Sequence, residues 1–61
     1  MIKSVFKTVS GMVMVFNEHG EQIPKYQGPY EAVKESILRD APEDAEFYDE
    51  IIVKPISRET W

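Results

Sequence analysis

The sequence contains no cysteine among its 61 residues, and it has a single histidine, His19. The absence of cysteine excludes disulfide bonds, thiolate metal sites and thiol catalysis. One histidine cannot supply a multi-histidine metal site. The chain forms one domain at most, residues 1–61, and a domain of this size buries only about 60% of its unfolded surface. Such domains commonly depend on a disulfide, a metal or a partner subunit for stability.

Long apolar runs are also missing. No run approaches the roughly 20 residues of a membrane span, and residues 1–7 alternate charged and apolar side chains, unlike a signal peptide. We therefore expect a soluble, cytoplasmic protein without membrane association. The lack of cysteine agrees with a reducing compartment.

Basic residues are fewer than acidic residues, seven against eleven, so the net charge is −4. Residues 1–25 have three lysines and two glutamates, and residues 26–61 have four basic and nine acidic side chains. An acidic balance disfavours binding to a phosphate backbone. Six acids fall within the eleven positions from Asp40 to Glu50, but no frame there fits a calcium-binding EF-hand loop. We predict a solvated acidic loop without a tight metal site, and docking of a basic partner stays open.

Motifs for catalysis are absent as well. The sequence has no nucleophile elbow, no phosphate-binding glycine loop and no dinucleotide fingerprint. His19, beside Glu18, is expected at the tip of a hairpin loop, which offers neither a positioned partner nor a pocket. We therefore predict no enzyme activity, no cofactor and no small-molecule substrate.

The apolar pattern predicts an α+β domain with a small antiparallel or mixed sheet of three to four strands in the order ββ(β)αβ. Turn signals at Ser10-Gly11 and at Gly20 separate the first strands. Pro24 indicates an edge position for the third strand, and Pro55 is expected to end the last one. The expected strands cover residues 2–9, 12–17, 21–26 and 47–54, and the expected helix covers residues 29–40.

One helix is expected to cover one face of this sheet. Its apolar residues recur at helical spacing: Tyr30, Val33, Ile37 and Ala41. Glu31 in the first turn and Arg39 in the last turn suit the helix dipole. Pro42 stops the helix near Asp40.

The run from Met12 to Phe16, MVMVF, has no polar side and predicts a strand that is covered on both faces. If the Ser10-Gly11 turn pairs Val9 with Met12, one face of the sheet lies under the helix, with Phe6, Val13, Val15 and Ile23. The opposite face then collects Val5, Val9, Met12, Met14, Phe16 and Tyr26. Methionine is common at adaptable binding surfaces, and this patch is larger than isolated monomers usually expose.

The sequence therefore favours a non-enzymatic protein-interaction or regulatory module that self-associates, as a homodimer, through this methionine-rich face. One alternative is that residues 55–61, with Ile56 and Trp61, fold back across the same face. Another is a nucleic-acid-associated protein that uses the Lys3, Lys7 and Lys25 side of the sheet. The acidic balance and the lack of a basic, aromatic run make nucleic acid the less favoured partner.

Overall fold

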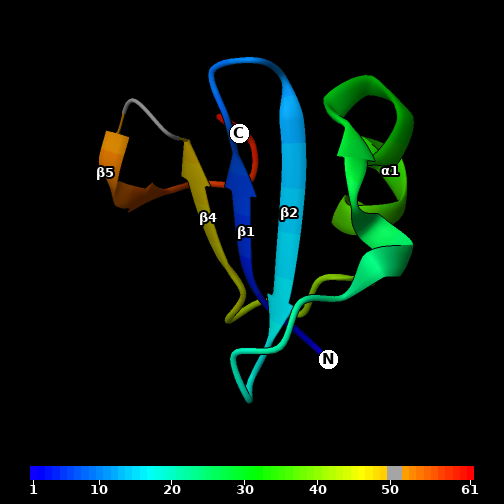
Figure 1. The fold of residues 1–61 in the computed structure, drawn as a ribbon. Helices are drawn as coiled ribbons and strands as arrows, with labels where there is room; N and C mark the ends of the chain where they lie inside the picture. The colour runs from blue at the N-terminus through cyan, green and yellow to red at the C-terminus, as the bar shows by residue number, and fades with distance from the viewer. Residues whose placement is uncertain (50–51) are drawn as a thin grey trace.

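The computed structural model describes residues 1–49 and 52–61. The strands are β1 (Ile2–Lys7), β2 (Met12–Asn17), β3 (Gly28–Pro29), β4 (Glu46–Asp49) and β5 (Ile52–Ile56). A 3-10 turn, η1 (Pro24–Tyr26), precedes β3, and one helix, α1 (Tyr30–Asp40), follows it. The sheet is mixed and has the order β3-β2-β1-β4-β5, with β1 and β4 parallel and the other pairs antiparallel (Figure 1).

The α+β class agrees with the prediction, but the sheet has five strands rather than three to four, and their order differs. The expected strand at residues 21–26 forms only in part. Gln22 makes an isolated antiparallel bridge with Phe16 of β2, but Pro24 begins η1 and the next strand forms later, at β3. Proline lacks a backbone donor for a sheet, and its fixed φ suits the first position of a helical turn.

The expected strand at residues 47–54 divides into β4 and β5, while Glu50 and Ile51 lie outside the described residues. Pro55 lies within β5 instead of ending the strand before it. β5 is an edge strand, where a missing backbone N–H need not break a ladder bond.

Helix α1 is confirmed, beginning one residue later than expected with Pro29 as its N-cap residue. The apolar face is also confirmed, since Ile37 is 0% and Ala41 8% exposed. Tyr30 and Val33 are partly buried and pack against the same core. The backbone N–H of Ala41 donates to the carbonyl of Ile37 and closes the last turn ahead of Pro42.

The predicted register of β1 against β2 is wrong by one residue. The N–H of Thr8 donates to the carbonyl of Met12 at 2.8 Å, and the N–H of Gly11 donates back to the carbonyl of Thr8 at 3.0 Å. Gly11 has a φ of 87°, so the loop has three residues and ends in a left-handed glycine, a common hairpin connection. Val5 therefore lies opposite Val15 and Phe6 lies opposite Met14. A shift of one residue turns β1 over relative to β2.

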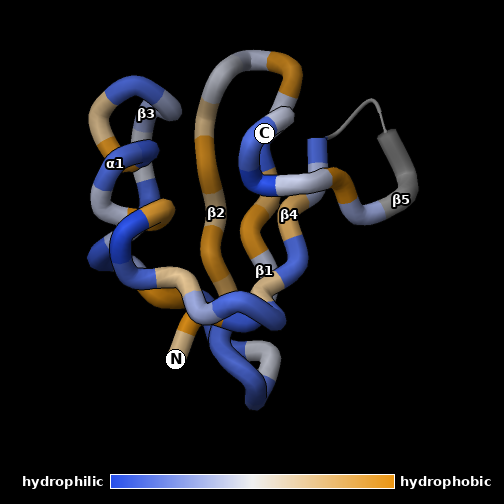
Figure 2. Tube along the Cα trace, turned by 180° about the vertical axis from the view of Figure 1, so that it is seen from behind, coloured by the Kyte–Doolittle hydropathy of each residue, from blue (hydrophilic) through white to orange (hydrophobic). Residues whose placement is uncertain are grey.

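The core lies between the sheet and α1. The most deeply buried strand residues all point to this face: Val5, Val13, Val15 and Phe47, each no more than 1% exposed. Ile37 of α1 packs against them, and Trp61, 2% exposed, belongs to the same cluster. Figure 2 shows the C-terminal segment in front of β1 and β4 on this side, with α1 beside β2.

The C-terminal segment covers the helix side of the sheet rather than the methionine side. The Trp61 ring lies 5.1 Å, centroid to centroid, from both Phe47 and Tyr30. Its carbonyl accepts hydrogen bonds from Lys7 Nζ at 3.3 Å and from the Tyr30 hydroxyl at 2.7 Å. The alternative in which residues 55–61 cover the methionine-rich face is therefore wrong. The Trp61 ring packs instead against Phe47 and Tyr30 on the helix side of the sheet.

Arg58 joins the C-terminal segment to the end of α1 by hydrogen bonds. Its guanidinium donates to the carbonyls of Ala41 at 3.3 Å and Pro42 at 2.6 Å, and it lies 5.2 Å above the Phe47 ring. A turn from residue 57 to residue 60, in which Ser57 Oγ accepts from the Thr60 N–H at 3.3 Å, brings Trp61 into the core. In the part of the chain that the structure describes, α1 and the C-terminal segment thus cover one face of the sheet.

Candidate functional site

The face of the sheet opposite α1 presents aromatic and methionine side chains. Alternation along each strand places them there, since their chain neighbours fill the core. These residues, here called the open face, are Phe6, Met12, Met14, Phe16 and Tyr48. Met12 is 43% exposed, and the other side chains are half-buried. All of them lie outside the buried core cluster, so they form a second apolar surface.

Phe6 on the central strand joins the two halves of the open face. Its ring stacks on Tyr48 of β4, with centroids 4.7 Å apart and planes 9° apart. It meets Phe16 of β2 edge to face, with centroids 5.7 Å apart and planes at 82°. Such aromatic pairs restrict one another's rotamers. The Phe6 ring is therefore held between Tyr48 and Phe16.

The polar groups at the edge of the open face come from Tyr48, Glu46 and Ser4. Tyr48 donates its hydroxyl to Glu46 Oε1 at 3.3 Å. Burial, together with the neighbouring Glu46 carboxylate, raises the pKa of Tyr48, so its phenol stays neutral near pH 7. Ser4, paired with Phe16 on one side and Glu46 on the other, adds an uncharged hydroxyl. Glu46 places one carboxylate at this edge.

The structure brings only part of the predicted interface together. Met12, Met14 and Phe16 share the open face, whereas Val9 lies in the β1–β2 loop and is 69% exposed. Val5, 0% exposed, belongs to the core, because the three-residue loop turned β1 over.

Tyr26 also belongs to the core, at 8% exposed, because it sits in η1 rather than on a strand. Sequence reasoning missed Phe6 and Tyr48, which take the places of Val5 and Tyr26. Phe6 had been assigned to the opposite face, and the parallel pairing of β1 with β4 that sets Tyr48 beside it joins segments far apart in the chain. No local pattern records such a pairing.

Tyr26 has a structural partner of its own. Its hydroxyl donates to Asp40 Oδ2 at 2.6 Å and so ties η1 to the end of α1. The hydrogen bond from Tyr26, followed by one from Arg39, lowers the pKa of Asp40. The same bond and burial raise the pKa of Tyr26.

Replacing Tyr26 with phenylalanine is expected to move the pKa of Asp40 up toward its ordinary value of about 3.9. A carboxyl group with a lowered pKa in the folded state contributes stability above the unfolded pKa, and this contribution is lost as the pH falls through the folded pKa. The variant should therefore lose less stability on acidification than the wild type. An NMR titration of the Asp40 side chain measures the shift, with Tyr30→Phe as the control. An unmoved Asp40 titration would contradict the bond.

The three lysines of the nucleic-acid alternative do not share one surface. Lys7 is half-buried on the helix side, where its Nζ lies 3.5 Å from Asp49 and 4.3 Å above the Tyr30 ring. Lys25 lies over the Tyr26 ring in η1. Lys3 is exposed on β1. A phosphate backbone needs several free cations along one path, whereas Lys7 is engaged by Asp49 and by the Trp61 carbonyl.

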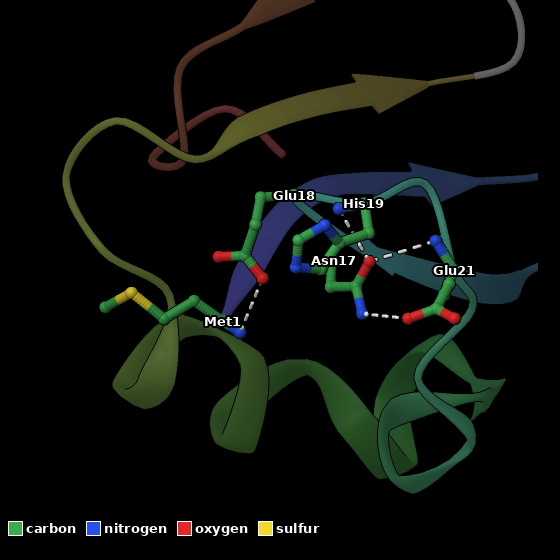
Figure 3. A network of polar contacts seen from close by, with 5 residues as sticks. All are labelled: Met1, Asn17, Glu18, His19 and Glu21. Atoms are coloured by element: carbon green, nitrogen blue, oxygen red, sulfur yellow. Dashed lines mark hydrogen bonds and ion pairs between the residues drawn. The ribbon is translucent and has the colours of Figure 1, made fainter.

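His19 lies in the β2–η1 loop, exposed as predicted (Figure 3). Asn17 organises the loop, because its Oδ1 accepts from the backbone N–H groups of His19 and Glu21 at 2.9 Å each, while its Nδ2 donates to Glu21 Oε1 at 3.2 Å. The amine of Met1 lies 3.4 Å from Glu18 Oε1. A backbone hydrogen bond within Glu18 and then this amine lower the pKa of Glu18. These contacts belong to the hairpin loop itself.

Within residues 1–49 and 52–61, no group of three or more histidine, aspartate or glutamate side chains is arranged to hold a metal ion. No helix in that part of the chain has the length and apolar character needed to cross a membrane. A cavity of about 540 Å³ lies beside the C-terminal segment, but the Arg58 guanidinium at its wall already bonds two carbonyls. The open face remains the candidate site. Comparisons with protein-family models, curated proteins and solved structures find no match for this chain.

Proposed function

We propose that this chain is a non-enzymatic protein-interaction module that forms a homodimer through its open face. The observation that carries the proposal is the aromatic and methionine surface, joined through Phe6, on the side of the sheet opposite α1 and the C-terminal segment. Phenylalanine, tyrosine and methionine are enriched in the cores of interfaces, where charged side chains are depleted. The open face has this composition.

The size of the face agrees with a weak, specific contact. The two larger dimensions of the molecule, 24 and 22 Å, limit the contact to about 500 Å² on each copy, so two copies would bury at most about 1,000 Å² together, close to the lower limit for a specific interface. Interfaces at this end of the range belong to weak, transient complexes. The contact would still cover a sizeable share of the 4136 Å² that one chain exposes.

Charge and symmetry favour a second copy as the occupant. The chain carries a net charge of −4, but none of the five side chains that define the open face is charged. Two copies can therefore meet face to face without placing many like charges in the contact. A two-fold axis makes one apolar patch self-complementary, and dimers of this symmetry are the commonest oligomers.

Replacing Met14 with glutamate is expected to convert the dimer into a folded monomer. Met14 lies on β2 opposite Phe6, so the substitution puts a carboxylate near the centre of the face, where it loses water without gaining a partner. The fold should survive, because the side chain points away from the core. Light scattering after gel filtration measures the mass, and circular dichroism checks the fold.

The matched control is Ala32→Glu, which adds the same charge at an exposed position of α1. This variant should remain a dimer. A wild-type chain that stays monomeric at high micromolar concentration would contradict self-association, and would leave a different protein as the occupant of the open face. Dissociation of both variants alike would show that net charge, rather than the open face, controls the association.

A further inference from the structure

We infer that Met12 and Met14 form a modification site at which oxidation by hydrogen peroxide to methionine sulfoxide releases the partner from the open face. The inference rests on the proposed function, because the partner is the second copy of the chain. Met12 is 43% exposed and Met14 is half-buried, and both project from the same face of β2. Peroxide can therefore reach both thioethers in the single chain.

The reaction needs only the thioether and the peroxide. The sulfur lone pair attacks one peroxide oxygen, so that an S–O bond forms while the O–O bond breaks. The departing hydroxide takes up the proton of the transferred hydroxyl and leaves as water. Sulfur loses two electrons, which reduce the peroxide, and the product is a polar sulfoxide.

A sulfoxide oxygen does not suit this surface. Met14 lies directly opposite Phe6 on the neighbouring strand, and that ring offers no N–H or O–H donor. Dimer formation would strip water from the sulfoxide oxygen without replacing its hydrogen bonds. We expect the dissociation constant of the dimer to rise at least tenfold. The fold should persist, because Val13 and Val15 carry the core contacts of β2 on the other side.

Dimer formation should also change how fast the two methionines oxidise. If Met12 and Met14 lie inside the contact between the copies, the partner shields their thioethers from peroxide. Met12 and Met14 should therefore oxidise more slowly as the chain concentration rises through the dissociation constant. Met1 is 78% exposed and lies outside the open face, with its amine beside Glu18. Its oxidation rate should not depend on chain concentration, which makes it an internal control.

The experiment treats the wild-type chain with hydrogen peroxide at several chain concentrations. Peptide mass spectrometry follows each methionine, and sedimentation equilibrium gives the dissociation constant before and after treatment. The same ratio of dissociation constants is measured for the double variant Met12→Leu, Met14→Leu. We expect at least a tenfold rise in the wild type, reversal by methionine sulfoxide reductases, and no peroxide effect in the variant.

Three outcomes would overturn the inference. A wild-type dimer whose dissociation constant is unchanged after complete oxidation of Met12 and Met14 would contradict it and leave the proposed function intact. An untreated wild-type chain that is monomeric throughout would contradict both. Equal loss of the dimer in the double variant would also contradict it, because Met1 or general damage would then be responsible.

Discussion

Replacing Ile37 with alanine is expected to lower the free energy of unfolding by about 2–5 kcal/mol. Ile37 is 0% exposed and is the residue of α1 that reaches deepest into the core under the sheet. Its loss removes apolar contacts and leaves a cavity that Val5, Val13 and Val15 cannot fill without moving the strands. β-branched side chains on a strand have little rotamer freedom with which to close it.

This loss of stability should be visible in an equilibrium unfolding curve. Domains are stable by only about 5–15 kcal/mol in total, and small ones lie at the low end. A urea unfolding curve should therefore show the Ile37→Ala midpoint far below that of the wild type, with a substantial fraction of the chain unfolded in buffer. The control, Glu35→Ala on the exposed side of α1, should change the free energy by less than about 0.5 kcal/mol. Similar midpoints for all three chains would mean that α1 does not bury this face.

Replacing Trp61 with alanine is expected to lower the free energy of unfolding by about 3–5 kcal/mol. The residue is 2% exposed and packs its ring against Phe47 and Tyr30. Fraying of the C-terminal segment offers little relief, because it would expose Phe47, which is itself 1% exposed. Arg58 would also lose its position above that ring. The loss should therefore appear in the global unfolding transition.

Two further variants separate the contribution of the Trp61 ring to stability from other effects of the substitution. Trp61→Phe keeps an aromatic ring and removes the indole Nε1, which is buried without a hydrogen-bond partner in the described part of the chain. Its destabilisation should be clearly smaller than that of Trp61→Ala, since a costly unpaired donor disappears as well. Glu59→Ala, at an exposed position nearby, should change little. Equal losses in both Trp61 variants would contradict the packing argument.

Much of the fold could be predicted from local patterns. The spacing of Tyr30, Val33 and Ile37 indicated α1 and its buried side, because helical periodicity is a property of the segment itself. The strand at residues 12–17 was located for a similar reason, since a turn signal stands at each of its ends. Its two faces were also assigned correctly, with Val13 and Val15 in the core and Met14 on the other side.

The sequence did not determine which strands pair with one another or in which register. A turn of two residues and a loop of three are both compatible with Ser10-Gly11, because both can use a left-handed glycine. The structure has the loop of three, and the inclusion of Val9 in the loop sets whether Val5 or Phe6 faces α1. The parallel pairing of β1 with β4 was equally hidden, because it depends on how the whole chain between them packs.

The sequence predicted an apolar sheet face opposite the helix, but it identified only some of the residues on that face. The run from Met12 to Phe16 correctly indicated that β2 has two apolar faces, but its alternation cannot reveal which neighbours share each face. The open face therefore gained Phe6 and Tyr48 and lost Val5 and Tyr26. The exchange strengthens the aromatic character of the surface and leaves the expected type of partner unchanged.

The central claim is that two copies of the chain meet through the open face, and an isotope-filtered NMR experiment tests it most directly. Labelled and unlabelled chains are mixed at high micromolar concentration, and contacts between protons of different copies are recorded. We predict such contacts between the Met14 methyl group of one copy and the Phe6 or Tyr48 ring of the other. An absence of contacts between copies, or contacts only among residues of α1, would contradict the claim.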